Sequence, residues 1–195
     1  MNNSILYNRA EIIEKALNNV GPGYYKIITS YSNSGIVRER VFCYEFYHQM
    51  RLVMGENPSL SLCGEIDKRG HYHFQPRDRK NPDFILHNAG TFEGNELVIE
   101  VKGEMKKEPI KKDFETLSTF IERYNYKIGF FILYNHSLCK FTEKFYIWYG
   151  DSLNSKFINS YDRIMVICKK DGYSQSEKRV LRDIIESRVN NNFIT

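Results

Sequence analysis

The sequence lacks long apolar runs, paired cysteines and a leader-like start. No stretch approaches the roughly 20 apolar residues that a membrane-spanning helix needs, and the first residues, MNNSILYNRAE, do not place a basic stretch before an apolar one. We therefore expect neither a membrane span nor a secretion signal. The four cysteines lie far apart and form no C-x-x-C pair. They are expected to be buried, reduced thiols of a cytoplasmic protein rather than a zinc site or a disulfide framework.

The composition is that of a chain able to fold around a core. Of the 195 residues, 42% are hydrophobic and 14% aromatic, while 27% are charged, which argues against intrinsic disorder. The length suits one domain, and no repeat or low-complexity tract divides it. We predict a single domain over residues 1–195. It would have an N-terminal helical extension (1–36), a core (38–134) and a C-terminal strand and helix that complete it (135–195).

The apolar residues recur with two different periods along the chain. Helical spacing is found in four segments: residues 9–19, 38–54, 109–124 and 174–189. Strand-like apolar runs occupy five: residues 60–66, 83–87, 96–102, 127–134 and 162–170. Residues 24–31 fit either a short strand or irregular chain, and residues 141–153 are ambiguous. The order of these elements predicts an α/β fold with a mixed central β-sheet flanked by helices.

Charged side chains interrupt two of the apolar strands. Glu100 and Lys102 are two residues apart in LVIEVK, so they share one face of their strand. Asp83 starts the preceding strand, 17 residues before Glu100. If the two strands pair as a hairpin, Asp83 lies beside Glu100. Ionised groups in the middle of an apolar strand are costly unless they face a wet cleft or a metal ion.

Two carboxylates and an ammonium group suit metal-assisted hydrolysis of phosphodiesters. Mg²⁺ prefers carboxylate oxygens and keeps several waters, so two acids can hold the ion and leave positions for water and phosphate. The lysine supplies positive charge where negative charge develops. We therefore predict Mg²⁺, with Mn²⁺ as a substitute, as the cofactor. An E-x-K pair also occurs as a structural ion pair on solvent-facing strands, and that interpretation stays open.

Pro82-Asp83, the 17-residue interval and Glu100-Val101-Lys102 resemble the PD-(D/E)XK nuclease superfamily, which has the restriction-endonuclease-like fold. The resemblance spans about residues 38–134. It implies that Asp83 and Glu100 are metal ligands and that the carbonyl of Val101 is a third. Lys102 would orient or activate the attacking water.

The same resemblance points to an acid on the helix before the sheet. Members of the superfamily often carry one there, and Glu45 in VFCYEFYHQMR is similar to it. Glu45 would assist a metal ion or its water. No Q-x-x-x-Y pattern of the RecB-like members follows the lysine, so the subfamily stays open. Glu65 and Asp67 alternate onto one strand face and are further candidates for the same cleft.

Positive charge is concentrated around these strands. The chain has 28 basic and 24 acidic residues, a net charge of +4. Residues 68–80 hold five basic residues and one acid, and residues 102–112 hold five lysines and two glutamates. Both segments could grip phosphates, although a solvated loop and a charged helix start would have the same composition. The predicted nucleic-acid-binding residues are Lys68, Arg69, Arg77, Arg79, Lys80, Lys106, Lys107 and Lys111.

The sequence thus predicts a Mg²⁺-dependent endonuclease that acts on DNA in preference to RNA, in restriction, repair or a mobile element. A homodimer is expected if both strands are cut. The alternative is a non-catalytic domain of the same fold that binds nucleic acid or a protein partner. A third interpretation is a structural protein in which Glu100 and Lys102 form an ordinary salt bridge.

Overall fold

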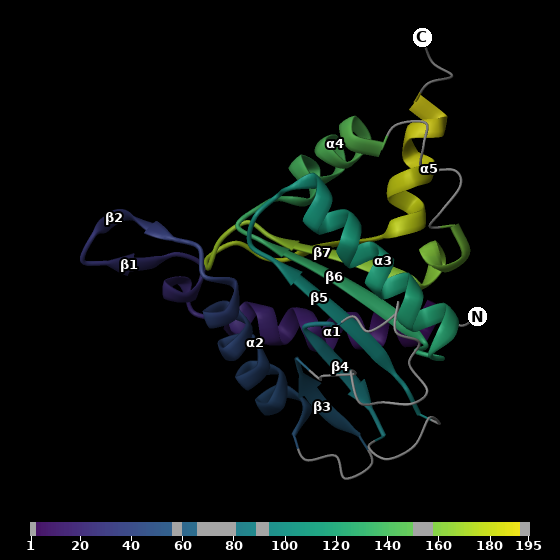
Figure 1. The fold of residues 1–195 in the computed structure, drawn as a ribbon, viewed down its shortest axis with the longest axis horizontal. Coiled ribbons are helices and arrows are strands. Elements are labelled where there is room, and N and C mark those ends of the chain that lie inside the picture. The colour runs from purple at the N-terminus through teal and green to yellow at the C-terminus, as the bar shows by residue number, and fades with distance from the viewer. Residues whose placement is uncertain (1–2, 56–59, 66–80, 89–93, 150–157, 192–195) are drawn as a thin grey trace.

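A mixed six-stranded β-sheet with helices on both faces forms the body of the protein in a computed structural model (Figure 1). The structure describes residues 3–55, 60–65, 81–88, 94–149 and 158–191. The α/β class predicted from the sequence is confirmed. The strands of this sheet are β3 (Ser61–Gly64), β4 (Phe84–His87), β5 (Leu97–Lys102), β6 (Ile128–Tyr134), β7 (Ile164–Lys169) and β8 (Glu177–Val180). The helices within the described residues are α1 (Asn3–Asn19), α2 (Glu39–Met54), α3 (Lys107–Arg123), α4 (Leu138–Tyr149) and α5 (Leu181–Asn191).

The strands follow one another across the sheet in chain order, from β3 to β8. Strands β3, β4 and β5 are antiparallel, β5, β6 and β7 are parallel, and β8 returns antiparallel to β7. The two parallel steps need crossovers, which α3 and α4 provide. Strand β6 in the middle is buried along its whole length, as expected for a strand covered on both faces.

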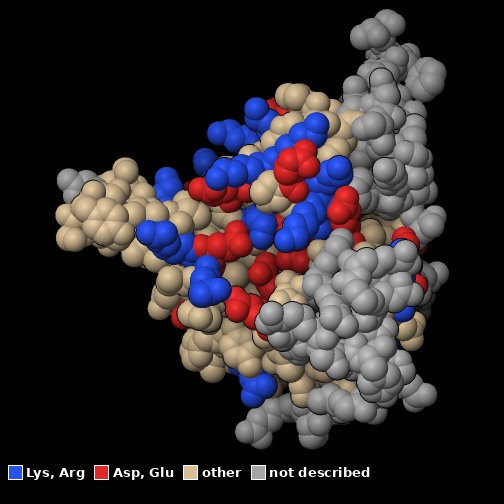
Figure 2. Space-filling view, viewed as in Figure 1, with Lys and Arg blue, Asp and Glu red and all other residues tan. Residues whose placement is uncertain are grey.

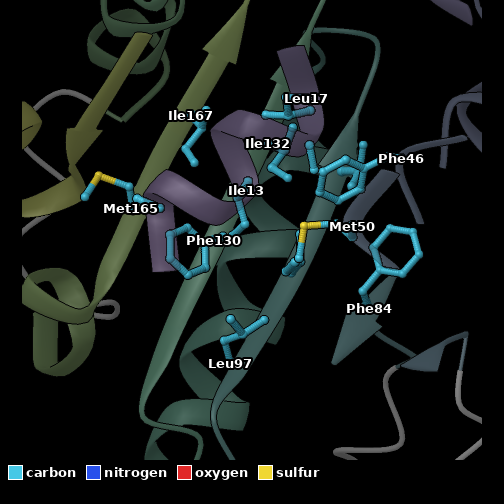
Figure 3. Packing of buried hydrophobic residues seen from close by; sticks show 14 of the residues in the cluster. Ile13, Leu17, Phe46, Met50, Phe84, Leu97, Phe130, Ile132, Met165 and Ile167 are labelled. Carbon is cyan, nitrogen blue, oxygen red and sulfur yellow. The ribbon is translucent and has the colours of Figure 1, made fainter. Parts of the chain in front are cut away.

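Helices α1 and α2 cover one face of the sheet (Figure 1). Figure 3 shows Ile13 and Leu17 of α1 and Phe46 of α2 packed against residues such as Phe130 and Ile132 of β6. These side chains are fully buried, and each such side chain stabilises the fold by about 1.5–3 kcal/mol through burial alone. Residues 1–36 were predicted to be an extension. Their helix is instead a layer of the core, because its apolar stripe is needed to cover the sheet.

Helices α3, α4 and α5 cover the opposite face. An aromatic cluster from α3, β6 and α4 fills this second core, with Phe114 lying 4.8 Å from Phe131 between ring centroids. The alternation of β5 divides its residues between the two cores: Ile99 and Val101 face α1 and α2, whereas Val98 faces α3. Glu100 and Lys102 therefore lie on the α3 side.

One segment differs from the sequence-based assignment, and two that the sequence left open are assigned by the structure. Residues 174–189, predicted as one helix, divide into strand β8 and helix α5, because the charged segment Glu177–Val180 pairs with β7 as an edge strand. The described part of the segment that the sequence left ambiguous, residues 141–149, belongs to α4. A 3₁₀ turn at Pro22–Tyr24 is followed by a hairpin of β1 (Ile27–Thr29) and β2 (Ser32–Ile36), so residues 24–31 include a short strand.

All four cysteines are free, as predicted, but Cys139 is exposed and Cys43 and Cys63 are only half-buried. The prediction of four buried thiols is therefore correct for Cys168 alone. In the part of the chain that the structure describes, no helix has the length and apolar character needed to cross a membrane.

Candidate functional site

The antiparallel pairing of β4 with β5 brings Asp83 and Glu100 together. Phe84 pairs with Ile99, so the next position along each strand sets Asp83 opposite Glu100. The two side chains share the α3 face and their carboxyl groups hydrogen-bond to each other. The hairpin predicted from the 17-residue interval is thus present, and the two acids lie close enough for both to contact one ion.

The side chain of Asp83 also takes the place of a backbone hydrogen-bond acceptor for β5. Its Oδ2 accepts a hydrogen bond of 2.7 Å from the backbone N–H of Val101, at the point where β4 begins and no longer supplies a carbonyl. Because the N–H and C=O of one strand residue point to the same side, the Val101 carbonyl faces this open edge as well. There it accepts a 3.0 Å bond from Lys102 Nζ.

Lys102 lies at the centre of a group of acids. Its Nζ is 3.1 Å from Glu39 Oε1 and 3.5 Å from Asp113 Oδ2, and its side chain is only 16% exposed. Burial disfavours the charged lysine, but Asp113, Asp83 and Glu39 outweigh burial, so the pKa of Lys102 is raised. The ammonium group therefore keeps its proton at neutral pH.

The helical acid that reaches this group is Glu39, not Glu45. Glu39 opens α2, contacts Lys102, and accepts a 3.4 Å hydrogen bond from the backbone N–H of Gly103. Glu45 is six positions after Glu39, which puts it about 120° around the helix and about 9 Å along it. There its Oε1 accepts a 2.7 Å bond from Gln49. The role predicted for Glu45 therefore has no geometric support, because Glu45 faces a different side of α2.

Asp113 of α3 is a fourth acid that sequence reasoning missed. It lies on the buried face of its helix next to Phe114, and its side chain is 8% exposed. Its buried Oδ2 makes no hydrogen bond of normal geometry to any described residue. The signal was present in the sequence, because an aspartate one turn after Ile110 and one turn before Leu117 falls inside the apolar stripe of α3.

Burial raises the pKa of three of these acids: Glu100, Asp83 and Asp113. Burial, followed by the charges of Asp83 and Asp113, raises the pKa of Glu100 well above its usual range. Burial also raises the pKa of Asp83, although Lys102 and the Val101 N–H oppose the rise. For Asp113, burial outweighs the nearby Lys102 and the pKa is about 7. The group thus carries more carboxyl groups than one lysine can neutralise.

Two hollows meet at Glu39. A groove of about 650 Å³ extends to one side, between Arg40 and Cys43 of α2 and Glu65 and Asp83 of the sheet. A hollow of about 350 Å³ lies on the other side and is lined by Lys102 and Lys106. Figure 2 shows acidic side chains gathered in the middle of this face, with basic side chains around them.

The three described lysines among the predicted nucleic-acid-binding residues have different surroundings. Lys106 lines the smaller hollow and pairs with Glu104. Lys107 lies over the ring of Tyr149, 5.9 Å from its centroid, and Lys111 lines a separate apolar crevice between α3 and α4. The structure therefore brings one of these three lysines to the candidate site, because the other two lie on the side of α3 that faces α4. Five further predicted residues lie outside the described residues: Lys68, Arg69, Arg77, Arg79 and Lys80.

Arg40 is an additional basic residue at the site. It lines the larger groove and lies 3.5 Å from Glu65, so this glutamate, a sequence candidate, is at the groove wall. Asp67, the other candidate on that strand, lies outside the described residues.

The oxygen atoms at the open edge of β5 suit the predicted divalent cation. Within the described ranges, no three His, Cys, Asp or Glu side chains form a ready metal site. Mg²⁺, however, is commonly held by one or two carboxylates together with water and substrate phosphates. The Asp83–Glu100 pair, with the Val101 carbonyl at its edge, meets that requirement. The buried Asp113 carboxyl group, with its Oδ2 3.5 Å from Lys102 Nζ, adds negative charge nearby when it is ionised.

Comparison of the chain with protein-family models, curated proteins and solved structures found no match.

Proposed function

We propose that the protein is a metal-dependent nuclease that hydrolyses phosphodiester bonds in DNA, with a core of the restriction-endonuclease-like type. The observation that carries the proposal is the meeting of Asp83, Glu100 and Lys102 at the open edge of β5. The element order α2, β3, β4, β5, α3, β6 supports it, since this is the segment over which the sequence resembles the PD-(D/E)XK superfamily.

Asp83 and Glu100, with the Val101 carbonyl, would hold Mg²⁺ or Mn²⁺. When bound, such an ion polarises a phosphate and lowers the pKa of a bound water. Glu100 has to lose its proton before it can bind the cation, and the positive charge of the ion would replace that proton. This exchange relieves the repulsion among the buried acids.

Lys102 would act as a charged donor rather than as a base. Its raised pKa keeps the ammonium group protonated at neutral pH, so it can orient the attacking water and stabilise negative charge on the phosphorane. Glu39 accepts from Lys102 at 3.1 Å and holds it at the end of β5. Glu39 is therefore a positioning residue for the lysine.

A nucleic-acid strand would lie along the two hollows that meet at Glu39. Arg40 lines one and Lys106 the other, so cations are available for the phosphates on either side of the scissile bond. Acids at the centre with cations around them form an arrangement suited to a polyanion held through a metal ion.

The test is cleavage of linear and circular DNA by the wild-type protein in Mg²⁺, Mn²⁺ or EDTA. Asp83→Asn and Lys102→Met remove one charge each at nearly constant size. Glu45→Gln is the matched control, because Glu45 lies on the other side of α2. We expect metal-dependent cleavage by the wild type and by Glu45→Gln, and loss in the two site variants.

Equal cleavage by all four proteins would show that this group is not the site. DNA binding without cleavage in any metal would instead favour the alternative, a non-catalytic nucleic-acid-binding domain.

A further inference from the structure

The β1–β2 hairpin projects from the body of the protein beside the start of α2 (Figure 1). It forms a two-stranded sheet of its own, with Thr29 paired to Ser32 and Ser30-Tyr31 as the turn. In β1 the exposed side chain is Ile28, which lies between the half-buried Ile27 and Thr29. Gly35, with φ +74°, lies where the register shifts and allows the ribbon to bend there.

The hairpin carries exposed apolar side chains and no charge. Ile28 is 77% exposed and Tyr31 is 74% exposed. The rest of residues 27–36 is largely small, with exposed serines at Ser30 and Ser34 and no charged side chain. Among the described residues, these two large apolar side chains belong to neither of the two hydrophobic cores. Their position suggests a contact with another molecule.

The surroundings of the hairpin favour a polyanion as that molecule. Lys26 precedes β1, and Arg38 and Arg40 follow β2; all three are exposed. Strand β2 ends three residues before Glu39, so the hairpin begins at the wall of the candidate site. No acidic residue lies between Ile27 and Arg38, and a phosphate backbone would meet no repulsion along the ribbon.

We propose that this hairpin enters the major groove of duplex DNA next to the scissile phosphate, an inference that rests on the proposed nuclease function. The major groove admits a two-stranded ribbon, and its base edges offer thymine methyl groups to apolar side chains and hydrogen-bond partners to serine hydroxyl groups. Ile28 and Tyr31 supply the apolar contact, while Lys26, Arg38 and Arg40 pair with the flanking phosphates.

A second copy of the chain is a poorer occupant. Stable dimers bury roughly 800 Å² on each partner, and two apolar side chains on a narrow ribbon fall well short of that area. A hairpin that enters a groove needs only a small apolar contact, since phosphate contacts supply most of the affinity.

The test is binding of the wild type and of Ile28→Ser/Tyr31→Ser to a fluorescent duplex of about 30 base pairs, close to three helical turns, in EDTA so that the duplex stays intact. Ile147→Ser is the matched control, because Ile147 on α4 is also 74% exposed. We expect the double variant to bind DNA about tenfold more weakly and the control to bind like the wild type. Thermal unfolding checks that all three proteins are folded.

Duplex RNA of the same length provides the second arm. Its deep, narrow major groove excludes side chains, so the wild type and the double variant should bind it equally. The proposal would be overturned if the double variant lost equal affinity for DNA and RNA, or lost no affinity for DNA. It would also be overturned if sedimentation showed that the wild type is a dimer and the double variant is not. If the wild type cleaves DNA and the double variant binds DNA as tightly as the wild type, only the proposed role of the hairpin is refuted. Wild-type protein that neither binds nor cleaves DNA refutes the proposed function as well.

Discussion

Replacing Asp113 with asparagine should stabilise the metal-free protein above neutral pH. Asp113 is buried on α3, and its Oδ2 lies 3.5 Å from Lys102 Nζ. An ordinary interpretation of that contact predicts that removing the charge breaks an ion pair and destabilises the fold. The burial of the carboxylate predicts the opposite result, because the ionised form is the costly one.

The size of the effect follows from the pKa. Burial, partly offset by Lys102, raises the pKa of Asp113 from 3.8 to about 7. Each pKa unit corresponds to about 1.4 kcal/mol, so ionising this group in the folded protein costs on the order of 4 kcal/mol. The pKa of Asp113 is higher in the folded protein than in the unfolded chain. Its contribution to the free energy of unfolding is therefore fully present below about pH 4, where the group is protonated in both states, and is lost as the pH rises through about 7.

Urea unfolding of wild type and Asp113→Asn in EDTA, at pH 5 and pH 8, measures this contribution. Asparagine resembles the protonated acid, so we expect the variant to gain about 1–4 kcal/mol over the wild type at pH 8 and much less at pH 5. Asp162→Asn, a change of the same kind at an exposed position of the 3₁₀ turn Ile158–Arg163, is the control and should be nearly neutral at both pH values.

A loss of stability at pH 8 in Asp113→Asn would refute this reasoning. It would mean that the attraction between Lys102 and Asp113 exceeds the cost of burying the carboxylate. The same result would weaken the view of the acid group as a site that holds excess negative charge for a cation.

Three further predictions concern the same region. Mg²⁺ should raise the unfolding temperature at pH 8 more than at pH 5, because the acids must lose protons to bind it. At 100 times its Kd, the ion should add about 2.7 kcal/mol to the free energy of unfolding. Calorimetry of Asp83→Asn should show no stabilisation by Mg²⁺. Glu39→Gln should slow DNA cleavage about 10- to 100-fold by releasing Lys102, while Glu45→Gln in the same assay keeps the wild-type rate; equal rates would remove Glu39 from the site. Gly103→Ala should destabilise the fold by about 1–3 kcal/mol in urea, because a Cβ would lie 2.4 Å from the ring of Tyr134, whereas Gly23→Ala, with open space around it, should be tolerated.

The core strands of the fold could be predicted from the sequence because their burial is complete. Residues 128–134 are apolar throughout and form a central strand covered on both faces. The edge strand β8 escaped prediction because its exposed positions carry charged residues such as Glu177 and Arg179, which protect an edge from pairing with other chains. In sequence, those charges look like the polar face of a helix.

The acids of the site were predictable only where the chain itself fixes their geometry. Asp83 and Glu100 meet through a local hairpin, and strand alternation sets their faces. Glu39 and Asp113 reach Lys102 from helices that pack on opposite faces of the sheet. The distances of Glu39 and Asp113 from Lys102 depend on how α2 and α3 pack against the sheet. The spacing of apolar residues along the sequence does not specify that packing. The same dependence on docking explains why Glu39 rather than Glu45 is the acid of α2 that lies beside Lys102.

The bond between the Asp83 side chain and the Val101 backbone ties assembly of the site to strand register. A slip of one residue between β4 and β5 would turn Asp83 to the other face of the sheet and leave the Val101 N–H unpaired. A chain with this error would lose both the carboxylate pair and a ladder bond in one step. Correct strand register and assembly of the candidate site are therefore coupled, and a misregistered molecule would lack the site altogether.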